Sequence, residues 1–161
     1  MAADTEEQKS SITWQCTPFS ELAPADLYAA IQLRQIVFVV EQKCAYLDAD
    51  GADRVADHLL GWRPIDGRRT LVAYARLLPP KVKYAEASIG RVVSHPDVRG
   101  TGVGRLLMQE ALARLERAAW GKEIRIAAQM YLERFYESFG FERVTDPYLE
   151  DDIWHVDMRR D

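Results

Sequence analysis

The sequence predicts a mixed α/β (α+β) fold, in which one β-sheet carries helices on both of its faces. The chain has 161 residues, which is the length of one ordinary domain. Short runs of strand-forming residues interleave with helical patterns, as they do where helices cover a sheet. The clearest helix, expected over 101–119, repeats an apolar residue at every fourth position: Val103, Leu107, Ala111, Leu115 and Ala119.

The N-terminal part is expected to hold a tail, a strand and a helix. Residues 1–11 are acidic and polar and are predicted to be a disordered tail, so that 12–161 form a single domain. Residues 12–19 alternate as a first strand does. Pro24 lies where proline is tolerated at a helix start, and this helix is expected to continue to about Gln42.

The end of that helix is ambiguous, because the β-branched run 36–40 is also compatible with a strand. Residues 44–57 are predicted to be an acidic loop, and a turn at Asp66-Gly67 indicates a hairpin around it. The remaining elements are expected, in order, as hairpin strands at 58–63 and 70–78, a strand at 87–94, the helix over 101–119, a strand at 124–128, a short helix at 131–139 and closing strands at 141–144 and 153–158 joined by 145–152.

Charge and composition exclude several classes of function. Lys and Arg total 21 against 25 Asp and Glu, so the net charge is −4, which argues against non-specific nucleic-acid binding and favours small molecules or cationic partners. The longest strongly apolar run, 36–40, is far short of a membrane span, and the polar N-terminus does not resemble a targeting peptide. Cys16 and Cys44 are expected to be reduced thiols of a cytoplasmic protein. Three histidines without a Cys/His cluster predict no metal site.

One turn carries the chemistry. A strand leads into glycines at Gly100, Gly102 and Gly104, and a long helix follows. Glycine lets the backbone adopt positive φ and approach a ligand closely. The first N–H groups of the helix lack internal partners and, with the helix dipole, suit a phosphate or pyrophosphate. Arg99 and Arg105 flank the turn, and arginine can bind phosphate through two hydrogen bonds.

Two well-known phosphate-binding loops do not fit this turn. A Rossmann fingerprint counted from Gly100 needs a glycine where the chain has Arg105. No Gly-Lys-Ser/Thr of a Walker A loop occurs anywhere in the chain. A plain strand–turn–helix, in which the glycines serve only tight packing, remains open on these observations.

The same turn resembles a known family. Arg99-Gly-Thr-Gly-Val-Gly104 matches the Arg/Gln-x-x-Gly-x-Gly/Ala signature of the GNAT superfamily of N-acetyltransferases. The preceding Val92-Val93-Ser94-His95-Pro96 resembles the family's fourth strand. Further along, Phe135-Tyr136-Glu-Ser-Phe-Gly140-Phe141 resembles its Leu-Tyr-x-x-x-Gly-Phe element. The two motifs, in order and separated by a helix and a strand, are more specific together than either one alone.

A closer likeness is to the ElaA-type branch of that family, at 33–42, 148–153 and His155, so that the resemblance covers nearly the whole chain from residue 12. It implies a mostly antiparallel sheet of six or seven strands, splayed between the fourth strand (87–94) and the fifth (124–129). Acetyl-CoA would lie in this opening as a co-substrate. The exposed backbone groups of splayed strands need partners, which an extended pantetheine chain can supply.

The resemblance also implies which residues bind acetyl-CoA. The pantetheine arm would pair with the backbone of Val92, Val93 and Ser94. Gln129 stands where many relatives have an asparagine that touches the cofactor, which puts that contact in doubt. The pyrophosphate would be bound by the turn and the residue that follows it: Arg99, Gly100, Thr101, Gly102, Val103, Gly104 and Arg105.

Tyr136 matches the tyrosine that, in relatives, points its hydroxyl at the CoA sulfur, and a phenol can protonate a departing thiolate. The alternative is an aromatic on the core face of the helix, beside Phe135 and Phe139.

A base or a water path must also deprotonate the acceptor ammonium before it attacks a thioester. Many relatives carry a glutamate on the fourth strand, but the matching position here is Gly90. His155 is the preferred candidate, because histidine needs little perturbation to act near neutral pH, and Glu86 is the other. The alternative for His155 is a half-buried strand histidine hydrogen-bonded to its neighbours.

The acceptor amine is expected between the N-terminal helix and the C-terminal strands. Glu41, Glu150, Asp151 and Asp152 are the carboxylates that would hold its ammonium, and solvated loop charges are the alternative reading of each. The acceptor could be a small molecule or a protein amine, and the protein could be a monomer or a homodimer.

The resemblance therefore predicts an enzyme that moves an acetyl group from acetyl-CoA to a primary amine by direct attack in a ternary complex. A catalytically inactive CoA-binding module and a protein-interaction module on the same fold are the alternatives. The intact glycine turn argues against the interaction module, and Tyr136 argues against loss of catalysis.

Overall fold

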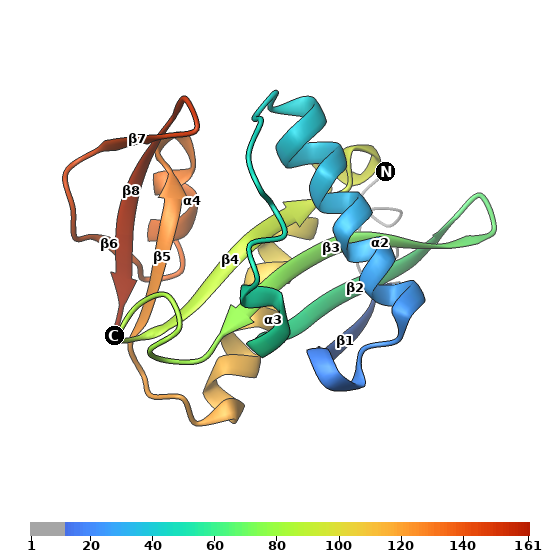
Figure 1. The fold of residues 1–161 in the computed structure, drawn as a ribbon, viewed down its shortest axis with the longest axis horizontal. Coiled ribbons are helices and arrows are strands. Elements are labelled where there is room, and N and C mark those ends of the chain that lie inside the picture. The colour runs from blue at the N-terminus through green and yellow to red at the C-terminus, as the bar shows by residue number, and fades with distance from the viewer. Residues whose placement is uncertain (1–11) are drawn as a thin grey trace.

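A computed structural model describes residues 12–161, so the expected tail at 1–11 lies outside the described residues. Over this range eight strands form one sheet, in the order β1-β2-β3-β4-β5-β8-β6, with β7 beside β8 (Figure 1). The strands are β1 (Thr13–Pro18), β2 (Asp57–Ile65), β3 (Arg68–Leu78), β4 (Ala87–Ser94), β5 (Ile124–Gln129), β6 (Glu142–Arg143), β7 (Tyr148–Glu150) and β8 (Ile153–Arg160).

The longer helices are α2 (Pro24–Arg34), which continues as a π-helical segment (Gln35–Glu41), α3 (Val103–Ala118) and α4 (Glu133–Glu137). Short 3-10 turns lie at Phe19–Glu21, Ala52–Val55, Pro96–Val98 and Met130–Leu132. Neighbouring strands are antiparallel except β4 and β5, which run parallel. The predicted fold class is confirmed, and the strand count exceeds six or seven by the three-residue strand β7.

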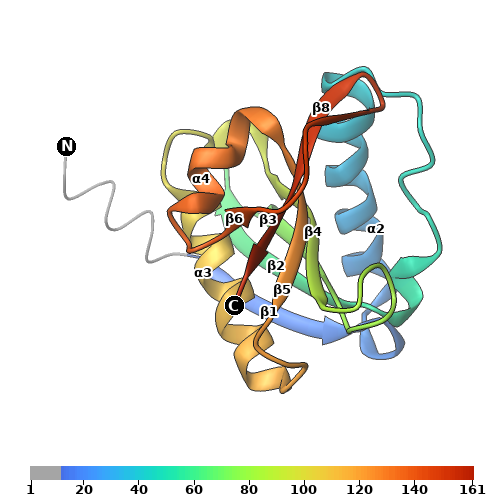
Figure 2. The same cartoon turned by 90° about the vertical axis from the view of Figure 1, so that its left-hand side faces the viewer.

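Helices cover both faces of the sheet, with α2 on one side and α3 and α4 on the other (Figure 2). The apolar stripe predicted for α3 is buried against the sheet at Val103, Leu107, Ala111 and Leu115. On the opposite face α2 and its continuation pack a second, smaller core against β2, β3 and β4. Helices therefore cover both faces of the sheet.

Strands β4 and β5 are joined by only two residue pairs within the described chain, Ala87 with Ile124 and Ser88 with Arg125. Beyond these pairs the strands diverge, and Figure 1 shows β5 and β8 leaning away from β4. The splay expected between the fourth and fifth strands is present. From Ile89 to Ser94, strand β4 keeps its partner β3 on one side but has no strand partner on the other.

A β-bulge in β4 lies where the strands part. Tyr74 pairs with Val93 and Arg76 pairs with Gly90, so that Arg91 and Val92 together oppose one residue of β3. Arg91 has φ +52°, in the left-handed region that few non-glycine residues adopt. A bulge bends its strand and increases the local twist, which turns β4 away from β5.

The ambiguous run 36–40 is helical. It forms a π-helical segment, in which the Gln42 N–H donates to the Val37 carbonyl at 2.9 Å. The buried side chain of Val37 packs in the smaller core beside Leu33, which holds this β-branched run in a helix. Wide π-turns recur near functional sites, and this one delivers Glu41 and Gln42 to the opening between β4 and β5.

The closing segment holds one more strand than the sequence indicated. Residues 145–152 were expected as a plain connection, but β7 pairs with β8 as a hairpin. The two-residue turn is Asp151-Asp152, with φ +49° and +61°, as a type I′ turn requires. Glycine and asparagine are the usual residues for such a turn, so two aspartates gave no hairpin signal.

Candidate active site

A cavity of about 920 Å³ fills the opening between β4 and β5. Its walls come from the end of the π-helical segment, the 44–50 segment, β4, the glycine turn, β5, α4 and the β7–β8 hairpin. No single element builds it. The cavity is a property of the splayed sheet, and it is large enough for an extended ligand of several hundred daltons.

The glycine turn forms one end of the cavity. Gly100 and Gly102 have φ +77° and +86°, a conformation that strains any residue with a side chain. The first helical bond of α3 is donated by the Leu106 N–H to the Gly102 carbonyl, at 3.2 Å. The N–H groups of the three residues before Leu106 therefore lack partners inside the helix, and with the helix dipole this geometry suits an anion.

Two arginines flank this turn, and each is already oriented. Arg99 forms an ion pair with Glu41, with 2.7 Å between Nη1 and Oε1. Arg105 donates to the Ser138 hydroxyl at 3.0 Å and lies over the Phe139 ring, 4.9 Å from its centroid. Glu41 is thus at the anion-binding end of the cavity, where its charge is balanced by Arg99.

Tyr136 of α4 lines the cavity. Its side chain is 6% exposed and packs edge-on against Phe135 and Phe141 with ring centroids 5.2 and 6.2 Å apart. Within residues 12–161 its hydroxyl makes no hydrogen bond. Burial raises the pKa of Tyr136 above its ordinary value, so the phenol keeps its proton at neutral pH.

His155 lies across the opening on β8, paired in register with Gln129 of β5. Its Nδ1 is 2.8 Å from the Ile153 carbonyl oxygen, which can only accept a hydrogen bond, so Nδ1 carries the proton. In the neutral ring Nε2 then keeps its lone pair. The Tyr148 ring stacks on the imidazole, with centroids 5.9 Å apart and planes 19° apart, and fixes its orientation.

Residues 42–44 bridge the two halves of the opening. Gln42 and Gln129 exchange side-chain amide hydrogen bonds of 3.4 and 3.2 Å. The Cys44 thiol donates to the Asp151 carbonyl at 3.4 Å, which ties the bridge to the β7–β8 turn. Burial is the main cause that raises the pKa of Cys44, so this thiol stays protonated and is not a nucleophile at neutral pH.

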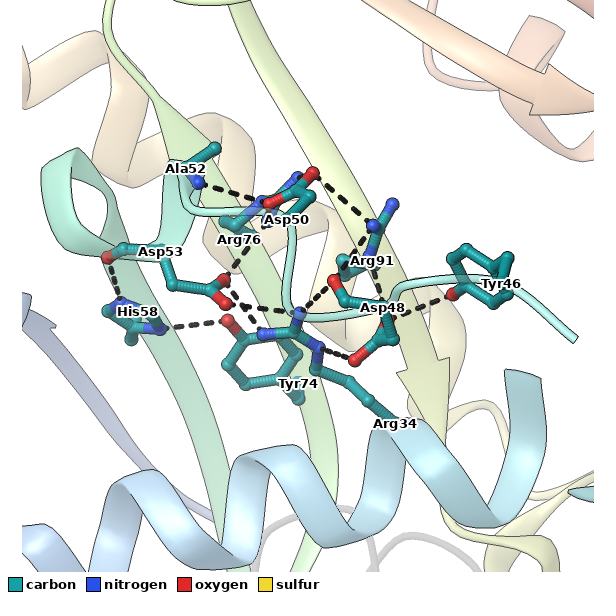
Figure 3. A network of polar contacts seen from close by, with 10 residues as sticks. All are labelled: Arg34, Tyr46, Asp48, Asp50, Ala52, Asp53, His58, Tyr74, Arg76 and Arg91. Carbon is teal, nitrogen blue, oxygen red and sulfur yellow. Dashed lines mark hydrogen bonds and ion pairs between the residues drawn. The ribbon is translucent and has the colours of Figure 1, made fainter. Parts of the chain in front are cut away.

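A buried ion network holds the 44–50 wall of the cavity (Figure 3). Arg34 of α2 is fully buried, and its Nε donates to Asp48 Oδ2 at 2.8 Å. Its other nitrogens donate to the Asp48 carbonyl at 2.9 Å and to the Asp53 carboxylate at 2.8 and 3.3 Å. One guanidinium thus holds the loop that follows the helix at two points, Asp48 and Asp53.

A second guanidinium shares the same carboxylate. Arg76 of β3 donates to Asp53 at 3.0 Å and to both oxygens of Asp50 at 2.7 and 3.0 Å. Arg91, at the bulge of β4, pairs with Asp48 at 2.9 Å and with Asp50 at 3.4 Å. The network therefore links α2, β3 and β4 to one loop.

The carboxylates of this network stay ionised because the arginines oppose the effect of burial. Burial alone would raise the pKa of Asp50 and of Asp53. Their hydrogen bonds and ion pairs with the arginines outweigh burial, so the pKa of Asp53 is lowered and that of Asp50 falls to about 2. His58 closes one side: its Nε2 is 2.9 Å from the Asp53 carbonyl and its Nδ1 is 2.8 Å from the Tyr74 hydroxyl. Burial lowers the pKa of His58, which is therefore a neutral core residue.

Comparison with known proteins agrees with this geometry. Residues 69–161, more than half of the chain, match the family model described as an acetyltransferase (GNAT) domain. The chain belongs to the GNAT acetyltransferase family. Over 152 residues it is 43% identical to Protein ElaA of Escherichia coli K12, with 93% of this chain and 97% of that protein covered. This confirms the predicted resemblance and supports an acyltransferase activity in general.

Solved structures of GNAT proteins give the same picture. A structure described as an acyl-CoA N-acyltransferase from Pseudomonas aeruginosa has a TM-score of 0.87 and 46% identity, covering 94% of this chain and 100% of that one. Escherichia coli ElaA has a TM-score of 0.84 and 42% identity, covering 93% and 99%. The fold of this GNAT protein is therefore that of known family members.

The cavity of this GNAT protein gathers most of the residues that the sequence indicated. The predicted site residues that line it are Glu41, Val92, Val93, Ser94, Arg99, Gly100, Gly102, Val103, Gly104, Arg105, Gln129, Tyr136, Glu150, Asp151 and His155. Over the described range, no group of three or more His, Cys, Asp or Glu side chains is arranged to hold a metal ion. No helix among residues 12–161 is long and apolar enough to cross a membrane.

Three predicted residues lie outside the cavity, each for a local reason. Thr101 turns inward, because its hydroxyl and its N–H both bond to the Val98 carbonyl, at 2.5 and 3.4 Å. Glu86 precedes β4 at the paired end of the β4–β5 junction, away from the opening. Asp152 is the outer residue of the hairpin turn and is exposed.

Other cavity residues were missed by sequence reasoning. They include Gln42, Cys44, Tyr46, Asp50, Lys83 and Arg91. Most lie in segments without periodicity that were read as loops, where only the tertiary fold decides which side chains face a cavity. For Arg91 the bulge is the cause, because it adds a residue to the strand and cannot be read from the alternation of side chains.

Replacing Asp53 with alanine should lower the free energy of unfolding by about 3–5 kcal/mol, because it leaves two buried guanidinium groups short of a partner. Urea unfolding followed by circular dichroism measures this change. The matched control is Asp161→Ala, which removes an exposed pair with Arg159 and should cost less than about 1 kcal/mol. Equal losses in the two variants would contradict the assigned role of the network.

Proposed function

We propose that this GNAT protein transfers an acetyl group from acetyl-CoA to a primary amine by direct attack, with both substrates bound in the opening between β4 and β5. The observation that carries the proposal is Tyr136, whose ring is buried, whose phenol keeps its proton and whose hydroxyl makes no hydrogen bond within residues 12–161, on the wall of a cavity that also contains an unpaired strand edge and the start of α3.

The residues present fit acetyl-CoA. The free N–H groups at the start of α3 suit its pyrophosphate, and Arg105 adds positive charge there, while Arg99 is paired with Glu41. The unpaired edge of β4 at Val92, Val93 and Ser94 offers backbone donors and acceptors to the amides of a pantetheine chain. Bound there, acetyl-CoA supplies an activated thioester.

Three side chains would serve the transfer. Nε2 of His155, directly or through water, would accept a proton from the acceptor ammonium, so that the amine nitrogen can form the new C–N bond to the acetyl carbonyl carbon. The Tyr136 hydroxyl would donate its proton to the sulfur as the C–S bond breaks, and the resulting phenolate would take up the second proton that the nitrogen loses as it becomes an amide. Gln129, held by Gln42, would position the strand end between them.

Tyr136→Phe keeps the packing of the ring and removes only the hydroxyl. Turnover should fall by about 10²-fold or more, the usual contribution of a positioned acid. Release of CoA thiol measures turnover, and the rise in melting temperature with acetyl-CoA measures binding, which should be retained.

The control is Tyr28→Phe, an exposed tyrosine on α2 outside the cavity, which should change neither readout. Full activity of Tyr136→Phe would exclude the acid role. A wild-type protein that is stabilised by acetyl-CoA but releases no thiol with any amine would instead be a CoA-binding module.

Gly102→Val should weaken CoA binding at least about tenfold, because a side chain at this positive φ shifts the turn by which the backbone approaches the ligand. Arg99→Ala should weaken it less, since the turn keeps its N–H groups. Calorimetry with CoA measures both affinities. Gly67→Val is a matched control, because Gly67 has φ +74° in the distant β2–β3 turn, and unchanged CoA affinity for Gly102→Val would refute the pyrophosphate site.

The base is tested by the pH profile of kcat/KM. His155→Gln should remove the acidic limb of the profile, because it removes the group that must be unprotonated to accept the ammonium proton. Glu86→Gln should keep that limb, since Glu86 lies outside the cavity. A limb that survives in both variants would indicate proton removal through water alone.

A further inference from the structure

Some charged side chains around the cavity form ion pairs, and others do not. At the glycine turn, Glu41 and Arg99 neutralise each other. At the far end, Asp50 is held by Arg76, and Arg91 by Asp48. Three charged cavity residues at this far end form no ion pair with any residue between 12 and 161: Lys83, Glu150 and Asp151.

The loop that carries Lys83 is held firmly at the mouth of the cavity. Its turn is closed by the Lys81 N–H, which donates to the Tyr84 carbonyl at 2.7 Å. The Tyr84 hydroxyl donates to Asp157 of β8 at 3.4 Å, and its ring stacks on Arg125 of β5, 4.8 Å from the guanidinium carbon. The loop between β3 and β4 is thus anchored across the splay, to the strand that carries His155.

Lys83 is an exposed cation that lines this end of the cavity. Its Nζ lies 5.3 Å from the Tyr84 ring centroid, and Glu150 of the β7–β8 hairpin lines the same cavity. Loss of hydration lowers the pKa of Lys83, Glu150 opposes that change, and Arg91 and Arg76 add to it. A ligand anion placed here would relieve the repulsion from the two arginines.

We propose that the acceptor is a free amino acid, whose carboxylate is bound by Lys83 and whose ammonium is held by Glu150 and Asp151 next to His155. This inference rests on the proposed acetyl transfer and names the class of its acceptor. One cation and two carboxylates of the same cavity wall form no ion pair within residues 12–161, and together they complement a molecule that carries both charges.

The charge balance favours a carboxylate over a phosphate at Lys83. A phosphate carries up to two charges and is typically bound by several donors, often an arginine fork. The arginine at this end, Arg91, is already occupied by Asp48 and Asp50. A single lysine, a compact point charge, matches the single charge of a carboxylate.

The experiment compares each amino acid with the amine that remains when its carboxylate is removed. Suitable pairs are lysine and cadaverine, ornithine and putrescine, phenylalanine and phenethylamine, serine and ethanolamine, and histidine and histamine. Release of CoA thiol from acetyl-CoA gives kcat and KM for each. In at least one pair the amino acid should have a KM lower by on the order of tenfold, the worth of a hydrogen bond to a charged group.

Variants assign this preference to one residue. Lys83→Gln should remove most of it by raising KM for the amino acid alone, and Lys83→Glu should reverse it. KM for acetyl-CoA and the melting temperature should stay unchanged in both. The matched control is Lys81→Gln, which removes an exposed charge from the same loop outside the cavity and should keep the preference.

Two results would overturn the inference and leave the proposed acetyl transfer standing: no amino acid preferred over its amine, or a preference that survives Lys83→Gln. Failure of the proposed function looks different, because then no member of any pair releases thiol, which overturns the acceptor assignment with it.

Discussion

The parting of β4 from β5 after two residue pairs is the constraint on which the rest of the structure depends. A strand inside a sheet satisfies its backbone groups on both sides, and a buried N–H or carbonyl without a partner costs free energy comparable to a lost hydrogen bond. From Ile89 to Ser94, β4 has a strand partner on one side only. The open edge must be satisfied by water or by a ligand, so the fold itself creates a binding strip.

An opening of this kind persists only if something prevents the two halves of the sheet from closing. The bulge at Arg91 turns β4 away, and the same side chain enters the ion network through Asp48. Desolvating such charges is expensive, and the cost is offset because Asp50 and Asp53 each accept three hydrogen bonds from the arginines. The network therefore places the 44–50 wall at one fixed position relative to β4. This holds whatever the ion pairs contribute to the free energy of unfolding.

Much of the fold could be predicted because it depends on local patterns. The stripe on α3 repeats every four residues, and the glycine turn combines three small residues with a helix start, so both are visible in a short window of sequence. The network is not visible in such a window. Arg34 meets Asp48 14 residues away, Arg76 meets Asp50 26 residues away and Arg91 meets the Asp48 carbonyl 43 residues away, and no periodicity relates these positions. The β7–β8 hairpin escaped prediction for a related reason, because its aspartate turn is fixed by pairing with β8 and not by turn preference.

The two ends of the cavity also differ in the groups that line them. At the glycine turn and along β4 the wall offers backbone N–H and carbonyl groups, whose position depends on the path of the chain and so on a few glycines. At the other end the wall consists of side chains on three separate segments: the 44–50 wall, the β3–β4 loop and the β7–β8 hairpin. Each segment is anchored, by the ion network, by Tyr84 on Asp157 and by pairing with β8, and the Cys44 thiol joins the first segment to the third through the Asp151 carbonyl. The glycine turn can therefore be recognised in a short window of sequence, whereas Lys83 lies in an unpatterned loop and reaches the cavity only through the fold.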